Sequence, residues 1–349
     1  MKTMKAMQLT GARSLRYQEV ERPVCKENDV IVKVHCVGVC ATDLEIYQGE
    51  MIYFLNGQAT YPIIPGHEWS GEVVDIGRDV TRVKIGDRVV GETTISCGTC
   101  RTCLAGSYNL CPNRVENGVL GKDGACAEYM VYPAHALHVF DPSISYEQAC
   151  LLEPAAVSLR GIKRLEVTPE DSVAIIGAGP VGLLAVQAAK AYGAKQVVLI
   201  DMRETRLRQG LELGSDEIID LSRDDLIERA AALTNGEMFS RIIEASGSPA
   251  AVESITQIAA AGGRIVLLGL CGGKRAKIDL DTIVTSDLDI CGSLGSPGVW
   301  QSVVELLETK KLDTASLVTH RFSLHELEQA FSLMERKDPE IIKIVIHVC

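Results

Sequence analysis

A glycine-rich segment in the middle of the chain most strongly constrains how the chain can fold. The apolar run 173–176 leads into Gly177-Ala-Gly179-Pro-Val-Gly182, which an Ala- and Leu-rich helical pattern follows. A second apolar run, 196–200, ends at Asp201, 19 positions after Gly182. Strand, glycine turn, helix, strand and terminal acid together form the pattern of a parallel βαβ unit that binds a dinucleotide.

Each part of this motif has its own physical role. Gly177 allows the tight turn, Gly179 lets the backbone approach the pyrophosphate, and Gly182 lets helix and strand pack closely. The N-terminus of the helix, which we predict around Pro180 and Val181, stabilises the phosphates through its unpaired N–H groups. A glycine turn without a ligand is the alternative, and the complete pattern disfavours it.

The acid at the end of the second strand indicates which dinucleotide is preferred. Asp201 can accept hydrogen bonds from the adenosine ribose hydroxyls and would repel a 2′-phosphate. Arg203 and Arg206 follow it and could support a phosphate if they turned inward; otherwise one stacks near the adenine and the other is solvated. We therefore expect NAD as the cofactor, with NADP less favoured.

Four cysteines near residue 100 form a C-x2-C-x2-C-x7-C motif: Cys97, Cys100, Cys103 and Cys111. Four thiolates complete a tetrahedral shell around zinc and leave no position for a substrate, so the predicted zinc site is structural. An iron–sulfur cluster is an alternative that the missing proline pattern and the polar loop disfavour. Cysteines that bind no metal are the other alternative.

Three distant segments hold residue types that suit a catalytic zinc ion. They contribute Cys40, the pair His67 and Glu68, and Glu153, which stands alone among apolar residues. A carboxylate in such surroundings needs a partner. One thiolate, one imidazole and one or two carboxylates leave zinc an exchangeable position, as catalysis requires. Spacing alone leaves open whether these residues are structural, because only the fold can bring them together.

Length and charge exclude several classes of protein. The chain has 349 residues, more than one typical domain, and we predict a β-rich domain over 1–155, an α/β domain over 156–295 and a further segment over 296–349. The net charge is −11 and no basic run occurs, which argues against nucleic acid and anionic membranes as partners. No signal-peptide pattern or membrane span is recognisable, so we expect a cytoplasmic protein that acts on a small molecule.

Taken together, these residues resemble the zinc-dependent medium-chain dehydrogenases, which include alcohol, sorbitol and threonine dehydrogenases. The resemblance rests on Gly66-His67-Glu68 with Gly71, the four-cysteine loop, Glu153-Pro154, the glycine motif and Asp201, in family order over nearly the whole chain. It implies an α/β fold with a GroES-like β-rich catalytic domain, formed by both ends of the chain, and an inserted Rossmann domain with a doubly wound parallel sheet. It also implies a homodimer or homotetramer.

The resemblance further assigns roles to single residues. In the sorbitol and threonine branch it implies these catalytic zinc ligands: Cys40, His67, Glu68 and Glu153. Glu153 would act directly or through water, and which carboxylate binds zinc stays open. Thr42 matches the hydroxyl that takes the alcohol proton. Zinc would polarise the substrate hydroxyl while hydride passes to the nicotinamide. Other cofactor contacts fall at strand ends: Ser246, Leu268 and Ser293.

Two departures from the family pattern bear on the substrate. Where threonine dehydrogenases carry a His three residues after Thr42, this chain has Glu45; where threonine and sorbitol dehydrogenases carry an Arg, it has Ser296. Without that Arg a substrate carboxylate loses its bidentate partner. Three acids near one zinc would suit a cationic group, unless Glu45 is simply solvated. We expect a secondary alcohol, namely a polyol, a cyclitol or an amino alcohol, to be oxidised to a ketone.

Other functions stay open as alternatives. The chain could be an L-threonine 3-dehydrogenase, or an aminocyclitol dehydrogenase of the 2-deoxy-scyllo-inosamine type, which the string Pro-Gly-His-Glu-Trp-Ser-Gly resembles. A zinc-free quinone or enone reductase would need neither Cys40 nor the four-cysteine loop. A binding protein without catalytic activity would show a degraded metal site, and none is recognisable in the sequence.

Overall fold

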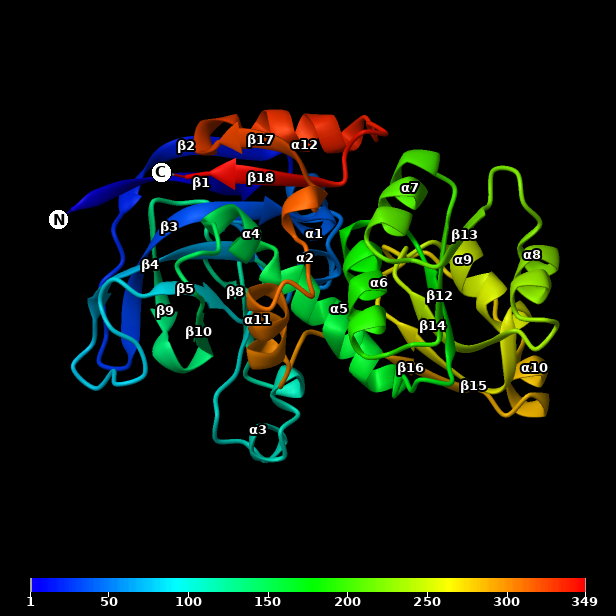
Figure 1. The fold of residues 1–349 in the computed structure, drawn as a ribbon. Coiled ribbons are helices and arrows are strands. Elements are labelled where there is room, and N and C mark those ends of the chain that lie inside the picture. Colours follow the sequence, from blue (N-terminus) through cyan, green and yellow to red (C-terminus); the bar gives the residue numbers. More distant parts are fainter. Residues whose placement is uncertain (1, 349) are drawn as a thin grey trace. The chain divides into compact units, whose positions relative to one another are not determined.

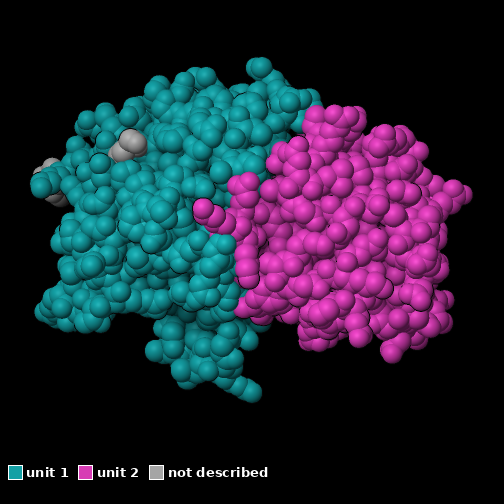
Figure 2. All heavy atoms as spheres, in the orientation of Figure 1, with its two compact units in different colours: residues 1–153, 295–309, 314–349 teal, residues 154–294, 310–313 magenta. Residues whose placement is uncertain are grey.

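The computed structural model describes residues 2–348, and within these residues the chain divides into two compact units (Figure 2). Unit 1 contains Met1–Glu153, Gly295–Thr309 and Thr314–Cys349, and unit 2 contains Pro154–Leu294 and Lys310–Asp313. Met1 and Cys349, which begin the first and end the third predicted segment, lie outside the described residues. The short return of 310–313 to unit 2 is a feature that the sequence pattern did not indicate.

Unit 2 is built on a parallel sheet with the strand order β13-β12-β11-β14-β15-β16, which is typical of dinucleotide-binding folds. Its strands are β11 (Ser172–Ile176), β12 (Gln196–Asp201), β13 (Glu217–Asp220), β14 (Phe239–Glu244), β15 (Ala259–Leu267) and β16 (Asp289–Gly292). Its helices are α6 (Pro180–Ala191), α7 (Glu204–Glu212), α8 (Leu226–Leu233), α9 (Pro249–Ser254) and α10 (Leu280–Thr285), and α5 (Leu152–Leu165) leads into the unit.

The apolar runs of unit 2 form strands because they are covered on both faces. Consecutive side chains, which point to opposite faces of a strand, have no exposed surface: Val173, Ala174 and Ile175 of β11, and Val197, Val198 and Leu199 of β12. A strand of a parallel sheet that lies between two layers of helices needs apolar side chains on both sides, which produces a continuous apolar run and no alternation. The carboxyl ends of β11, β12 and β14 therefore meet at one edge of the sheet.

Unit 1 is mainly antiparallel, with the strand order β10-β5-β4-β3-β18-β17 and β9 paired to β3. Its strands are β1 (Thr3–Gly11), β2 (Ser14–Glu21), β3 (Asp29–Val39), β4 (Glu68–Ile76), β5 (Arg88–Gly91), β6 (Thr94–Ile95), β7 (Val115–Asn117), β8 (Gly121–Lys122), β9 (Tyr129–Pro133), β10 (Leu137–Val139), β17 (Val318–Ser323) and β18 (Lys343–His347). Its helices are α1 (Ala41–Gln48), α2 (Ile52–Leu55), α3 (Arg101–Leu104), α4 (Tyr146–Cys150), α11 (Trp300–Glu308) and α12 (Leu327–Glu335).

Segments from opposite ends of the chain lie side by side in unit 1. The strand β18 pairs antiparallel with β3, and Figure 1 shows these red and blue strands next to each other. Within the same sheet, Trp69 of β4 packs edge-on against Tyr132 of β9 with ring centroids 5.0 Å apart, and both rings are buried. The apolar strands β3 and β18 thus share one hydrophobic core with β4.

Gly38 of β3 is the point where three strands converge. It pairs with Glu68 at the start of β4 and with Val345 of β18. A Cβ atom at position 38 would collide with the Glu68 carboxylate and lie 3.0 Å from Cε of Lys343. The missing side chain therefore makes room for two charged side chains inside the sheet.

Within residues 2–348, no helix combines the length and the apolar character needed to cross a membrane.

We expect Gly38→Ala to destabilise unit 1, because the added methyl group displaces buried charged groups. Overpacking of this kind costs about 1–3 kcal/mol, which urea unfolding followed by circular dichroism would measure. Gly11→Ala in β1 is the matched control, since nothing lies within 4 Å of its Cβ position. Equal effects of the two substitutions would contradict a packing constraint at Gly38.

Candidate functional site

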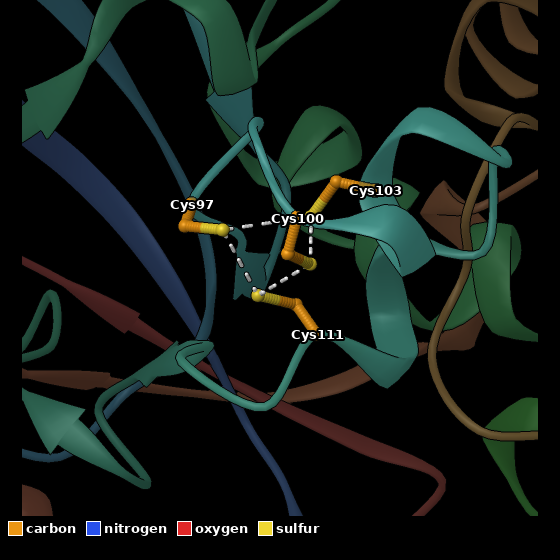
Figure 3. A group of neighbouring side chains, drawn as sticks. All are labelled: Cys97, Cys100, Cys103 and Cys111. Carbon is orange, nitrogen blue, oxygen red and sulfur yellow. Dashed lines mark hydrogen bonds between the residues drawn. The ribbon is translucent and has the colours of Figure 1, made fainter.

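The four cysteines of the loop around residue 100 converge on one point (Figure 3). Their Sγ atoms are 3.9 Å apart for Cys97 and Cys103, 3.5 Å for Cys97 and Cys111, 3.4 Å for Cys100 and Cys103, and 3.8 Å for Cys100 and Cys111. Zinc–sulfur bonds of about 2.3 Å at tetrahedral angles place neighbouring sulfurs about 3.8 Å apart. The donor set therefore fits a zinc ion without rearrangement of the loop.

Local backbone geometry favours the thiolate form of two of these residues, Cys97 and Cys100. Hydrogen bonds from the backbone of Thr99 and Cys100 lower the pKa of the Cys97 thiol to about 6. A backbone hydrogen bond from Cys103 lowers the pKa of Cys100 in the same way. Thiolates are the metal-binding form, so the backbone favours metal binding at Cys97 and Cys100. For Cys111, a backbone hydrogen bond from Cys97 lowers the pKa, but burial and the thiols of Cys97 and Cys103 outweigh it and raise the pKa to about 11. The proton of Cys111 would therefore have to leave when an ion binds.

A second group of candidate ligands lies in unit 1 where β3 ends and β4 begins. The ligand atoms of Cys40, His67 and Glu68 all lie within 4.8 Å of one another. Cys40 caps the N-terminus of α1, and Glu68 is the first residue of β4. His67 is 6% exposed and Glu68 2%, so two of the three side chains lie in the protein interior. The fold thus unites residues from two of the three segments that the sequence marked.

Asp43 connects the segment that carries Cys40 with the segment that carries His67, although the sequence motifs did not single it out. Its Oδ2 accepts the N–H of Cys40 at 2.9 Å, its Oδ1 accepts the N–H of Gly66 at 3.1 Å, and Oδ1 lies 3.4 Å from Nδ1 of His67. A carboxylate behind a ligating histidine fixes the ring and its tautomer. With Nδ1 facing Asp43, Nε2 of His67 is the nitrogen available to a metal ion.

Lys343 forms a buried ion pair with Glu68, and no sequence motif pointed to this lysine. The Lys343 side chain is 3% exposed, and its Nζ contacts Oε2 of Glu68. Burial lowers the pKa of Lys343, but Glu68, Cys40 and Cys150 together outweigh this effect and the net shift is upward. The available signal was a lysine inside the apolar run 341–346, because a buried charge needs a partner just as Glu153 does.

Glu153 lies near this group but outside it. Its side chain is buried at the start of α5, and Oε1 accepts a hydrogen bond from Thr93 Oγ1 at 2.8 Å. Burial raises the pKa of Glu153 to about 6, and the charge of Glu68 adds to the shift. Glu68, and not Glu153, therefore belongs to the cluster of Cys40 and His67 within the described residues.

Thr42 and Glu45 lie one turn apart on α1, so they share a helix face. Both are half-buried. Burial, and then the nearby Glu50, raise the pKa of Glu45. Glu45 is therefore not a freely solvated surface acid.

In unit 2 the glycine motif lies between β11 and α6. Gly177 has a φ of 103°, a left-handed conformation that favours glycine, and a Cβ on Gly182 would collide with the carbonyl oxygen of Gly177. Nothing lies within 4 Å of the Cβ position of Gly179. The helix α6 starts at Pro180, directly followed by Val181. Its first N–H groups are thus open to an anion.

Asp201 ends β12 and is turned toward this glycine loop. Its Oδ2 accepts the N–H of Ala178 at 2.6 Å, and its Oδ1 accepts the N–H groups of Met202 and Arg203 at 2.7 and 2.9 Å. Arg206 on α7 is half-buried; burial lowers its pKa, and Arg203 lowers it further. The carboxylate thus holds the loop while it remains at the edge of the sheet where a ribose would lie.

Two of the three remaining predicted cofactor contacts, Ser246 and Leu268, are positioned by a glutamate that the motifs did not reveal. Glu244 is fully buried at the end of β14, and its Oε1 accepts hydrogen bonds from Ser246 Oγ, Ser246 N and Gly247 N at 2.5, 2.8 and 3.0 Å. Leu268 N–H donates to the Glu244 carbonyl at 2.8 Å, and Ser293 N–H donates to that of Leu267 at 3.0 Å. The signal was an acid at the end of an apolar run, as with Asp201.

Comparison with known proteins finds matches along most of the chain. Residues 26–142 match the family described as alcohol dehydrogenase GroES-like domain, and residues 180–309 match the family of zinc-binding dehydrogenases. A sorbitol dehydrogenase from Bacillus subtilis is 31% identical over 99% of this chain and 97% of its own length. An L-threonine 3-dehydrogenase from Burkholderia vietnamiensis is 35% identical over 95% and 96%. The crystal structure of a zinc-binding dehydrogenase from Sinorhizobium meliloti bound to NADP has a TM-score of 0.91 at 30% identity and covers 100% of both chains.

We expect Lys343→Met to lower the free energy of unfolding by about 3–5 kcal/mol, because it leaves the Glu68 charge buried without its partner. Denaturant unfolding at equal zinc content would measure the change. Lys5→Met is the matched control: it breaks an ion pair with Glu19 whose side chains are 42% and 59% exposed, and such pairs contribute less than about 1 kcal/mol. A loss at Lys343 no greater than at Lys5 would refute the importance of the buried pair.

Proposed function

We propose that this chain, which belongs to the zinc-dependent medium-chain dehydrogenases, oxidises a secondary alcohol to a ketone and transfers the hydride to NAD. As a member of that family it is a zinc-dependent oxidoreductase of alcohols that uses NAD or NADP. The proposal is carried by the convergence of Cys40 with the buried His67 and Glu68, whose donor types suit a zinc ion with an exchangeable position.

In this proposal the two groups of ligands have different tasks. Cys40, His67 and Glu68 would hold the catalytic ion, with Glu153 close by, and the four-cysteine loop would hold a structural ion. When bound, the catalytic zinc supplies Lewis acidity toward the substrate hydroxyl. The four-cysteine loop offers no open position, so its ion would only order the loop.

The protein side chains then supply orientation and proton transfer. Asp43 fixes the ring of His67 and the backbone of Cys40 at once, which keeps both ligands in place. Lys343 balances part of the negative charge of Glu68, so the ligand group carries less excess charge in the interior. The hydroxyl of Thr42 would take the proton of the alcohol and pass it toward solvent.

The roles of the two units follow from these assignments. We propose that unit 1 is the GroES-like catalytic domain and unit 2 the NAD-binding domain, with the glycine motif on the pyrophosphate. The contacts of unit 2 with the cofactor, the glycine motif included, would come from these residues: Gly177, Gly179, Pro180, Val181, Gly182, Asp201, Arg206, Ser246, Leu268 and Ser293. We also propose a homodimer or homotetramer in the cytoplasm, where the free thiols of the described cysteines stay reduced.

For the substrate we favour a polyol, a cyclitol or an amino alcohol over an amino acid. Ser296 stands where relatives would carry an arginine; it is buried, and its Oγ accepts the Trp300 Nε1–H at 3.1 Å. It therefore offers a substrate carboxylate neither a positive charge nor a bidentate partner. The half-buried Glu45, on the same face of α1 as Thr42, would suit a hydroxyl-rich or cationic substrate. An L-threonine 3-dehydrogenase is the second candidate, because the Burkholderia enzyme is 35% identical over 95% of this chain.

A substrate panel would test this proposal. NADH formation should be faster with sorbitol, myo-inositol or an amino alcohol than with L-threonine, and a zinc chelator should abolish it. Highest kcat/KM with L-threonine would contradict the proposed substrate class, and turnover that survives complete removal of zinc would contradict the reaction itself.

Metal analysis tests the two ligand groups separately. We expect two zinc ions per chain after dialysis, and one in each of Cys40→Ser and Cys103→Ser, because each substitution removes one donor of a different group. Cys25→Ser should retain both ions, since Cys25 lies outside both groups. One zinc ion or none in the unaltered protein would contradict the catalytic assignment.

The cofactor preference depends on the charge of Asp201. We expect Asp201→Ser to raise the kcat/KM ratio of NADP to NAD by at least about tenfold, which corresponds to about 1.4 kcal/mol, because the repulsion of a 2′-phosphate is lost. Asp289→Asn removes an exposed carboxylate from β16 of the same unit and should leave the ratio unchanged. An unaltered ratio in the Asp201 variant would show that another residue selects the cofactor.

A further inference from the structure

A tyrosine of the four-cysteine loop bonds to two distant parts of unit 1. Tyr108 lies three residues before the candidate ligand Cys111. Its hydroxyl group donates a hydrogen bond to Oε2 of Glu92 at 2.7 Å and accepts the N–H of Gly298 at 2.9 Å. The hydroxyl thus acts as donor and acceptor at once, and both bonds reach beyond the loop.

Gly298 belongs to the segment 295–300, with which the chain returns from unit 2 to unit 1 and which we call the crossing segment. The same loop contacts this segment at a second point. A Cβ atom on Gly295 would lie 3.7 Å from Cβ of Asn109, the residue that follows Tyr108. Asn109 is buried, so this contact lies in the protein interior.

The backbone conformation of the crossing segment makes it dependent on such contacts. The φ angle is 63° at Gly295 and 70° at Gly298, and both residues therefore adopt the left-handed conformation that favours glycine. Glycine loses more conformational freedom on folding than any other residue, so a fixed position of both glycines is unfavourable in entropy. Bonds from outside the segment have to offset this cost.

Glu92 supports the far end of the crossing segment through a histidine. Its Oε1 lies 3.0 Å from Nε2 of His138, and the His138 ring stacks on Trp300 with centroids 5.3 Å apart. Trp300 is buried, and its Nε1–H donates to Oγ of Ser296 at 3.1 Å. One carboxylate thus contacts both groups that hold the segment, Tyr108 with one oxygen and His138 with the other.

The crossing segment continues the chain from a proposed cofactor contact. Ser293 lies two residues before Gly295, and it directly follows β16. In the sheet of unit 2, β16 and β12, which ends at Asp201, lie on opposite sides of β11. The two halves of such a sheet bind the two nucleotides of a dinucleotide. With the adenosine ribose at Asp201, the nicotinamide nucleotide belongs to the half that contains β16.

A metal ion in the four-cysteine loop would restrain Tyr108. The candidate ligands Cys103 and Cys111 flank this tyrosine in the chain, and their sulfurs belong to the same converging group. A bound ion would close the residues between the two sulfurs into a short loop and so limit the positions that the hydroxyl group can take. Without the ion this restraint is lost.

We propose that Tyr108 is a positioning residue, through which an ion in the four-cysteine loop fixes the crossing segment and, with it, the chain that continues from Ser293. The four-cysteine site then contributes to the reaction although it offers no place to a substrate. The inference rests on the proposed function for the identity of the ion and of the cofactor, and its first two tests need no turnover.

Hydrogen–deuterium exchange of the full-length, zinc-loaded protein tests the contact directly. In Tyr108→Phe, the backbone amides of 295–300 should exchange roughly fivefold faster or more, because the loss of two hydrogen bonds makes local opening easier. Cys103→Ser, which removes a ligand of the loop ion, should accelerate the same amides. Tyr61→Phe is the matched control: it removes a hydroxyl that donates to the backbone carbonyl of Ile46 and should leave 295–300 unchanged.

The emission of Trp300 gives a second readout in the folded protein. The chain has two tryptophans, so subtraction of the spectrum of the matching Trp300→Phe protein isolates the emission of Trp300. This emission should move to longer wavelength in Tyr108→Phe and in Cys103→Ser, because a loosened segment admits water to the ring. It should not move in Tyr61→Phe.

Steady-state kinetics test the consequence for the reaction. Tyr108→Phe should keep the zinc content of the unaltered protein and lower kcat by at least about threefold, with a smaller change in the KM for NAD, because the nicotinamide half of the cofactor site is affected and the adenosine half is not. An unaltered kcat would overturn the role in the reaction.

Unchanged exchange of 295–300 in Tyr108→Phe would overturn the proposal. Exchange that rises equally throughout unit 1 would do the same, because it would show a general loss of stability. A lack of turnover in the unaltered protein would count against the proposed function alone, since exchange and emission are measured without a substrate.

Discussion

The contact between Lys343 and Glu68 is the interaction on which the candidate catalytic group depends. It joins the first residue of β4 to the first residue of β18, two positions that are 275 residues apart along the chain. An ionised glutamate in an apolar core is unfavourable unless a cation or a metal ion accompanies it. Gly38 leaves space for the pair, and the pairing of β3 with both neighbouring strands sets its position.

The same principle, a buried acid with defined partners, recurs in the candidate catalytic group and in the candidate cofactor site. Asp43 accepts hydrogen bonds from two loops and faces His67, while Glu244 holds the turn at Ser246. Neither residue needs to touch a substrate to matter. Each acid holds a backbone segment in place and thereby fixes the functional group that the segment carries. The low polarity of the surroundings makes these hydrogen bonds costly to break.

The sequence predicted those features whose residues are close together along the chain. The glycine motif and the four-cysteine loop are local patterns, and the family comparison and the structure confirm the predicted fold class, a GroES-like β-rich domain with a Rossmann domain. Asp43 and Lys343 were missed because their function depends on pairing between distant segments, which spacing does not report. Asp43 lies beside the motif residues Cys40 and Thr42, and Lys343 lies in an apolar run. The one signal in the sequence was therefore a charged residue at a position expected to be buried.

The return of the chain to the sheet of unit 1 also has a consequence for biosynthesis. Residues 154–294 form one continuous stretch, so most of unit 2 can fold as soon as it has left the ribosome. Unit 1 cannot complete its sheet so early, because β3 pairs with β18, which is synthesised about 300 residues later. Until β18 arrives, the apolar edge of β3 and the carboxylate of Glu68 lack their partners. The candidate metal ligands are thus translated early, but the group becomes charge-balanced only at the end of synthesis.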